Sequence, residues 1–129
     1  MTTASLAATA LGVRAFHRQL PGYKPTPLIR LERLVRSWRF NDIFVKDESA
    51  RFGLQAFKVL GGSHAVAHLV CRRLGQNLSD VTYDYLVSGE VRRKIGRITL
   101  ATATDGNHGR GVAWAAKQFG QNAAIYMPR

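Results

Sequence analysis

The sequence predicts an α/β fold built on part of an open parallel sheet with flanking helices. Strand-like and helix-like patterns alternate along the chain after about residue 40, as they do in proteins with parallel sheets. An apolar fraction of 46% is enough for a hydrophobic core. The length of 129 residues fits one domain of common size and excludes a complete two-domain enzyme with a cleft between its halves.

The first part of the chain is predicted to hold two short helices joined by a rigid connector. Residues 11–20 have a helical pattern, which Pro21 and Gly22 end. The connector at residues 25–27 contains two prolines and is extended, because proline restricts its own backbone and that of its predecessor. Apolar residues at helical spacing then predict a helix over residues 29–38. Residues 1–28 are thus an N-terminal arm and connector.

The middle of the chain is predicted to hold a strand and a long helix. Residues 43–45 form a buried strand, and polar residues follow it at 46–49. A loop at residues 51–55 leads into a helix over residues 57–74. Gly61 and Gly62 near its start each weaken the helix by ~1 kcal/mol. We therefore expect a ligand or a neighbouring backbone to come close to them.

The last part of the chain is predicted to complete the alternation. A short helix near residues 83–87 is followed by a strand at 99–103 and a polar turn at 104–109. The next helix runs through Phe119, Gly120 ends it, and a last strand covers residues 123–127. Ligands of open parallel sheets bind at the carboxyl ends of strands. The segments 46–58 and 104–109 are therefore the candidate site.

The chain is basic, with 19 Lys plus Arg against 8 Asp plus Glu and a net charge of +11. Such a balance can indicate a nucleic-acid or anionic membrane partner. The arginines are spread along the chain without a block of like charges, and no nucleic-acid-binding motif accompanies them. A solvated surface is the favoured interpretation, and a basic nucleic-acid-binding or accessory module stays as the alternative from another class.

The cysteine and histidine residues bear on the cellular compartment and on whether the chain binds a metal. A single cysteine excludes a disulfide framework and suits a reducing compartment, so we expect a cytoplasmic protein. No apolar run reaches the ~18–20 residues of a membrane span. His64 and His68 lie one helical turn apart without the intervening glutamate of zinc proteases, so we expect no metal site.

Lys58 is the first candidate for chemistry. It lies among apolar residues at a predicted helix start, where partial desolvation and the helix N-terminus would both disfavour the ammonium form. A free amine can attack a carbonyl, which is what Schiff-base lysines do. The alternative is a lysine whose amine simply reaches the surface.

The polar turn at residues 104–109 is the second candidate. Its backbone N–H groups and the following helix could receive a carboxylate or phosphate. Alternatively, Asp105 or Asn107 merely caps the helix and His108 is an ordinary exposed histidine. The glycine spacing is not that of the dinucleotide-binding fingerprint.

These segments together resemble one family. The residues that carry the resemblance are Pro21-Gly22-Tyr23-Lys24-Pro25-Thr26-Pro27-Leu28, Val45-Lys46-Asp47-Glu48-Ser49, Arg51-Phe52-Gly53-Leu54, Ala56-Phe57-Lys58-Val59-Leu60-Gly61-Gly62 and Ala101-Thr102-Ala103-Thr104-Asp105-Gly106-Asn107-His108-Gly109-Arg110-Gly111-Val112-Ala113-Trp114. Together they resemble diaminopropionate ammonia-lyase, one of the fold-type II pyridoxal-phosphate enzymes, over residues 16–129.

The resemblance implies a cofactor, a reaction and a role for each site residue. Lys58 would hold pyridoxal 5′-phosphate and take the Cα proton from one substrate enantiomer, and Asp105 would be the base for the other. Asn107 would hydrogen-bond the pyridoxal 3′-oxygen. The substrate carboxylate would be received by Thr104, Asp105, Gly106, Asn107 and His108. The reaction would be α,β-elimination of 2,3-diaminopropionate to pyruvate and ammonia, by a homodimer; the close alternative is a threonine or serine dehydratase.

The chain departs from the family pattern in two ways. His64 stands where the family tends to have tyrosine. The family members are also much longer than one domain. We therefore expect residues 29–129 to be a partial lyase domain, truncated at its C-terminus and corresponding to the N-terminal portion of a fold-type II enzyme. The resemblance also implies that the glycine-rich loop that binds the cofactor phosphate in this family lies outside these residues, so we expect little or no lyase activity from this chain alone.

Overall fold

The computed structural model describes the backbone of residues 3–128 and the side chains of residue 7 and residues 9–128. Its elements are α1 (Thr3–His17), β1 (Leu28–Arg30), α2 (Glu32–Trp38), β2 (Phe44–Lys46), the 3₁₀ turn η1 (Arg51–Gly53), α3 (Lys58–Leu74), the 3₁₀ turn η2 (Leu78–Asp80), α4 (Tyr83–Leu86), α5 (Gly89–Ile95), β3 (Thr99–Ala103), α6 (Asn107–Gln118) and β4 (Asn122–Tyr126). No helix of the described residues is long and apolar enough to cross a bilayer.

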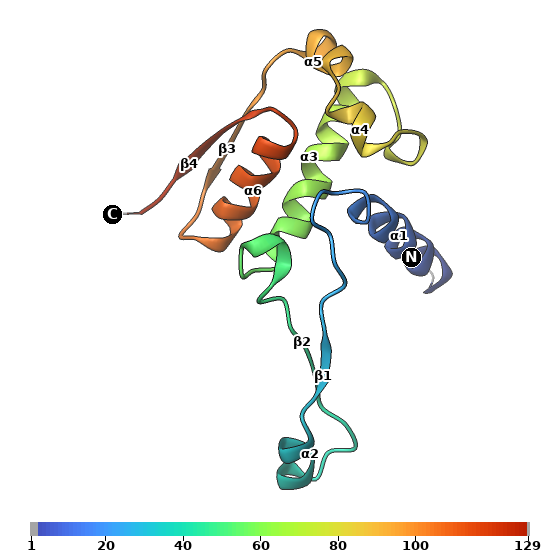
Figure 1. The fold of residues 1–129 in the computed structure, drawn as a ribbon, viewed down its shortest axis with the longest axis vertical. Coiled ribbons are helices and arrows are strands. Elements are labelled where there is room, and N and C mark those ends of the chain that lie inside the picture. Colours follow the sequence, from blue (N-terminus) through green and yellow to red (C-terminus); the bar gives the residue numbers. More distant parts are fainter. Residues whose placement is uncertain (1–2, 129) are drawn as a thin grey trace.

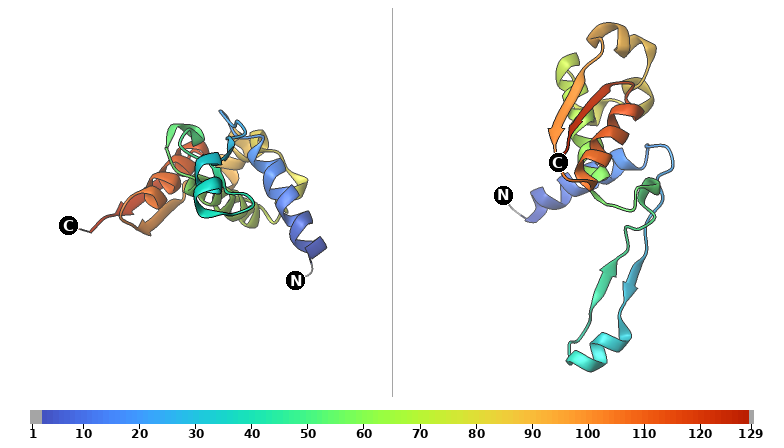
Figure 2. Two further views of the ribbon diagram at one scale, coloured as in Figure 1. Left: turned by 90° about the horizontal axis from the view of Figure 1, so that it is seen from below. Right: turned by 90° about the vertical axis from the view of Figure 1, so that its left-hand side faces the viewer.

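The body of the molecule is layered around a βαβ unit. Strands β3 and β4 pair in parallel, from Thr99 opposite Asn122 to Ala103 opposite Tyr126. Helix α6 joins them and lies against one face of this small sheet, α3 packs on the other side of α6, and α1 lies beyond α3 (Figures 1 and 2). The prediction of an α/β fold with part of a parallel sheet is therefore confirmed.

The hydrophobic core is centred on α3. One face of this helix is buried along its length, through Val59, Val66 and Val70. Its neighbours come from α1, the region of α4 and α5, and α6; the buried cluster consists of Phe16, Leu20, Val66, Ala67, Val70, Cys71, Tyr83, Leu86, Val91, Ala115 and Phe119. The helix predicted over residues 57–74 is thus amphipathic, with its apolar face packed into the core.

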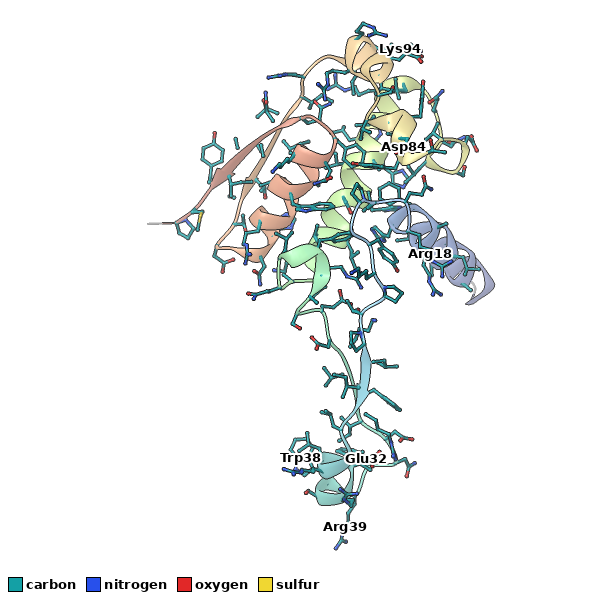
Figure 3. The ribbon with its side chains drawn as sticks, in the orientation of Figure 1. Arg18, Glu32, Trp38, Arg39, Asp84 and Lys94 are labelled. Atoms are coloured by element: carbon teal, nitrogen blue, oxygen red, sulfur yellow. The ribbon has the colours of Figure 1, made fainter. Side chains whose placement is uncertain are left out.

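Strands β1 and β2 form a two-stranded antiparallel ribbon that carries α2 and projects from the body (Figure 1). We call residues 28–46 the arm, which is a different segment from the N-terminal arm predicted at residues 1–28. Trp38 and Arg39 lie at its far end (Figure 3). The prediction that residues 43–45 form a buried strand in front of the site is wrong. Val45 pairs with Ile29 instead, and β2 is exposed along its length.

The pairing of β1 with β2 also changes the start of the helix predicted at residues 29–38. Its first residues are extended in β1, so the helix begins only at Glu32. The first helix, predicted over residues 11–20, instead covers Thr3–His17, and α5 was not predicted. The remaining predicted elements are confirmed with small shifts at their ends. Helix α3 begins one residue later than predicted, and Gly120, with φ +62°, follows the last turn of α6 as predicted.

Candidate functional site

Lys58 is the first residue of α3. Its neighbours in sequence are anchored in the body, because the side chains of Ala56 and Val59 are only 8% and 1% exposed. The Lys58 side chain itself is exposed, so the predicted partial desolvation is wrong for this chain. The helix start therefore holds the lysine backbone firmly and presents its amine to the outside.

The turn that follows β3 presents a second set of polar groups. The Oγ1 atom of Thr104 accepts a hydrogen bond from the Gly106 N–H at 3.3 Å, which shapes the turn. Helix α6 begins at Asn107 with Gly106 as its N-cap, and no side chain caps it. The alternative that Asp105 or Asn107 caps the helix is therefore wrong. Asp105, Asn107 and His108 are all exposed.

Close packing of α3 on α6 brings Lys58 and the turn to the same end of the body. A Cβ atom added at Gly111 would lie 3.2 Å from the Lys58 carbonyl carbon, and one added at Gly62 would lie 3.4 Å from the Gly111 carbonyl. The two helices also start at the same end (Figure 1). The expected close approach of a neighbouring backbone is confirmed at Gly62, whereas Gly61 has open space around it.

Gly109 fixes the turn against the sheet. A Cβ atom there would lie 2.5 Å from the Thr104 Cγ2 and 2.7 Å from the Ile125 Cγ2, both inside normal contact distance. Only glycine therefore lets the first turn of α6 lie this close to β4 and to the end of β3. The backbone N–H groups at the start of α6 are the kind of donors that receive carboxylates and phosphates.

Arg51 and its partners are a feature that the sequence interpretation missed. Arg51 is 4% exposed and pairs with Glu48, with the Nε of Arg51 2.7 Å from Oε2 of Glu48. The guanidinium holds the pKa of the Glu48 carboxyl below its usual range, and its hydrogen bonds are the largest cause. The spacing of three residues between opposite charges beside the lysine segment was the available signal.

The rings of three histidines lie near one another where α1 meets α3, namely His17, His64 and His68. The His17 ring is buried, and its Nε2 donates a 2.8 Å hydrogen bond to the Leu60 carbonyl. Burial lowers the pKa of His17, and burial with the neighbouring histidines lowers that of His64. The described residues contain no group of three or more histidine, cysteine or acidic side chains placed to hold a metal ion.

The described residues fit one end of a pyridoxal-phosphate site. Lys58 offers an exposed amine for the aldehyde, and Asn107 offers an amide donor from the start of the packed helix. A sequence profile described as "pyridoxal-phosphate dependent enzyme" matches residues 19–129, and the chain belongs to that family.

Within this family the chain is similar to diaminopropionate ammonia-lyases. It is 50% identical over 117 residues to the enzyme of Escherichia coli K12, covering 90% of this chain and 28% of that protein. It is 48% identical to the enzyme of Salmonella typhimurium LT2, covering 91% of this chain and 29% of that protein. The chain thus spans less than a third of the length of these relatives.

Solved structures give the same relationship. The holo enzyme of Escherichia coli superposes with a TM-score of 0.84 at 49% identity, over 95% of this chain and 30% of that one. Its complex with D-serine superposes with the same TM-score, 0.84. The resemblance seen in the motifs therefore extends over nearly the whole backbone of this chain.

Proposed function

We propose that this chain carries the lysine-bearing part of a pyridoxal-phosphate ammonia-lyase acting on 2,3-diaminopropionate. The observation that carries the proposal is the packing of α3 on α6, which brings Lys58 and the turn at residues 104–108 to one end of the body. The names of the relatives favour an ammonia-lyase over a threonine or serine dehydratase. In this proposal the complete enzyme is a cytoplasmic homodimer.

Each site residue has a defined role in the proposed reaction. Lys58 holds the cofactor through its amine and receives the Cα proton of one substrate enantiomer. Asp105 receives the Cα proton of the other enantiomer, and Asn107 hydrogen-bonds the cofactor's 3′-oxygen. Thr104, Gly106 and His108 complete the turn that receives the substrate carboxylate, with support from the dipole of α6. When bound, the cofactor supplies the electron sink that makes Cα proton removal feasible.

Labelling of the chain tests the assignment of Lys58. The chain is incubated with pyridoxal phosphate, reduced with borohydride and digested, and the modified peptide is identified by mass spectrometry. We expect the label on Lys58 and its loss in Lys58→Ala, whereas Lys117→Ala, which changes another exposed lysine, keeps it. Equal labelling of several lysines would overturn the assignment.

A hybrid protein tests the reaction. Residues 1–129 replace the matching part of the Escherichia coli enzyme, and pyruvate formation from each enantiomer of diaminopropionate is measured. We expect Asp105→Asn to abolish turnover of one enantiomer and to spare the other. Equal loss with both enantiomers would contradict the role of Asp105. Robust turnover by the 129-residue chain alone would contradict the expectation that the remaining length is needed.

A further inference from the structure

The loop that leads to Lys58 is tied to the connector by one buried side chain. The guanidinium of Arg51 donates at every nitrogen. Its Nε donates to Oε2 of Glu48 at 2.7 Å, its Nη1 to the Lys24 carbonyl at 2.8 Å, and its Nη2 to Oγ1 of Thr26 at 2.9 Å and Oε1 of Glu48 at 3.0 Å. The Tyr23 ring lies 5.4 Å from its central carbon.

The backbone after Arg51 has a conformation that needs outside support. Phe52 and Gln55 have φ of 49° and 55°, in the left-handed region that non-glycine residues rarely adopt. Such residues persist only where the surroundings determine their conformation. On the body side, the Phe52 ring packs on Trp114 of α6 at 4.6 Å between ring centres, and Ala56 is buried. On the other side, the support comes from Arg51.

We propose that Arg51 is a positioning residue, which fixes the loop at residues 51–57 and thereby sets where α3 begins and where Lys58 stands. The inference rests on the proposed function, because it takes Lys58 as the amine that holds the cofactor. Arg51 itself lies in the loop and acts through the backbone. Glu48 is its necessary partner, since a buried guanidinium without its carboxylate is strongly unfavourable.

The geometry requires arginine rather than a cation in general. Four acceptor contacts are spread over two chain segments, at residues 24–26 and at Glu48. A planar guanidinium with five donors can bridge them, whereas an ammonium cannot reach all of them at once. Arg51→Lys should therefore restore only part of the effect, although it keeps the charge.

The test uses the 129-residue chain with Arg51→Gln, Arg51→Lys and Glu48→Gln. Arg18→Gln is the matched control, because it makes the same chemical change at an exposed arginine. Hydrogen exchange of the amides at residues 54–60 is measured without cofactor. The rate of borohydride-trapped labelling of Lys58 by pyridoxal phosphate is measured separately. Exchange at residues 66–71 in the core of α3 reports global stability.

We expect Arg51→Gln to speed exchange at residues 54–60 by about tenfold or more while residues 66–71 stay unchanged. Labelling of Lys58 should fall in parallel. Arg51→Lys should be intermediate, and Arg18→Gln should match the unmodified chain. Glu48→Gln should be at least as severe as Arg51→Gln, because it leaves the guanidinium buried without its carboxylate. If Arg51→Gln does not fold, Arg51→Lys decides the question by the same measurements.

Three results would overturn the inference. The first is unchanged exchange at residues 54–60, and the second is exchange that rises equally in the core, which would indicate a merely structural role. The third is unchanged labelling of Lys58 in a loosened loop. If the unmodified chain is not labelled at Lys58 at all, the proposed function fails. Exchange in the loop would then still decide whether Arg51 holds it.

Discussion

Gly111 of α6 lies against the backbone of Val59 in α3, so closely that a Cβ atom at Gly111 would stand 3.0 Å from both the Cα and the nitrogen of Val59. At this point the two helices are as near as their backbones allow. Gly62 faces the same contact from the other helix, where an added Cβ atom would lie 3.4 Å from the Gly111 carbonyl. The relative position of the two helix starts, with Lys58 on one and Asn107 on the other, depends on the absence of side chains here.

Replacement of Gly111 by alanine should therefore force the helices apart. Because the obstructing atoms are backbone, they cannot rotate away, and we expect a loss of about 1–3 kcal/mol in the free energy of unfolding. Gly61→Ala is the matched control: a Cβ atom there meets nothing within 4 Å, so it should stabilise the helix by about 0.5–1 kcal/mol. Urea unfolding followed by circular dichroism measures both. Equal effects of the two variants would show that α3 and α6 are not packed this closely.

The buried imidazole of His17 should make the stability of the chain depend on pH. Burial is the main reason that its pKa is lowered. The stability conferred by the neutral ring is fully present above the ordinary histidine pKa of about 6.5 and is lost as the pH falls through the lowered value. Urea unfolding at pH 7.5 and 5.5 should show this loss, with a slope of at most about 1.4 kcal/mol per pH unit for one histidine.

His17→Gln should flatten this pH dependence. The lowered pKa of His64 acts in the same direction, so a smaller slope should persist in His17→Gln and disappear when His64→Gln is added. His108→Gln is the control, because His108 is exposed at the start of α6. A slope that survives in the double variant would assign the pH dependence to other groups.

Cys71 should be unreactive in the folded chain. Its side chain is 1% exposed within the core, and burial raises the pKa of the thiol, which leaves less thiolate to react. We expect alkylation by iodoacetamide at pH 8 to be about a hundredfold slower than in urea, since it requires local opening. Mass spectrometry of timed samples measures the rate. Comparable rates with and without urea would mean that the packing around α3 opens readily.

The arm should make the isolated chain associate. Large apolar side chains on it are more than half exposed, namely Leu28, Trp38, Phe40 and Phe44. Contiguous exposed apolar groups favour intermolecular contact. Sedimentation velocity should show association that grows with concentration and is weakened in the variant that combines Trp38→Ser with Phe40→Ser. Leu11→Ser, at an equally exposed position on α1, should leave it unchanged.

Local sequence patterns correctly predicted the elements whose formation depends on residues close together in the sequence. Helix α3, the glycine after α6 and the two short strands that flank α6 were all predicted, because each depends on residues close in sequence. Lys58 and the turn at 104–109 stand out for the same reason: unusual residue types gather within a few positions.

The strand that pairs with β2 could not be predicted from the sequence. An apolar run of three residues is compatible with a buried parallel strand or with an exposed ribbon, and only its pairing with β1 decides between them. The route to the site was therefore misassigned: Lys58 reaches the turn through helix packing at Gly111 rather than by following a strand of the same sheet. The contacts of Arg51 with Lys24 and Thr26 were not predicted for a similar reason. They join residues that are separated by 27 and 25 positions in the sequence.

The contact of Thr26 with Glu48 spans 22 residues, and Arg51 bonds to both of them. The arm leaves the body and returns to it at this one junction, so it is a closed excursion of the chain. We therefore expect that changes in its length, its sequence or the element at its tip leave the path that arrives at Lys58 unaltered. The arm is thus a segment that can be modified or replaced separately, while the residues at its base keep their positions.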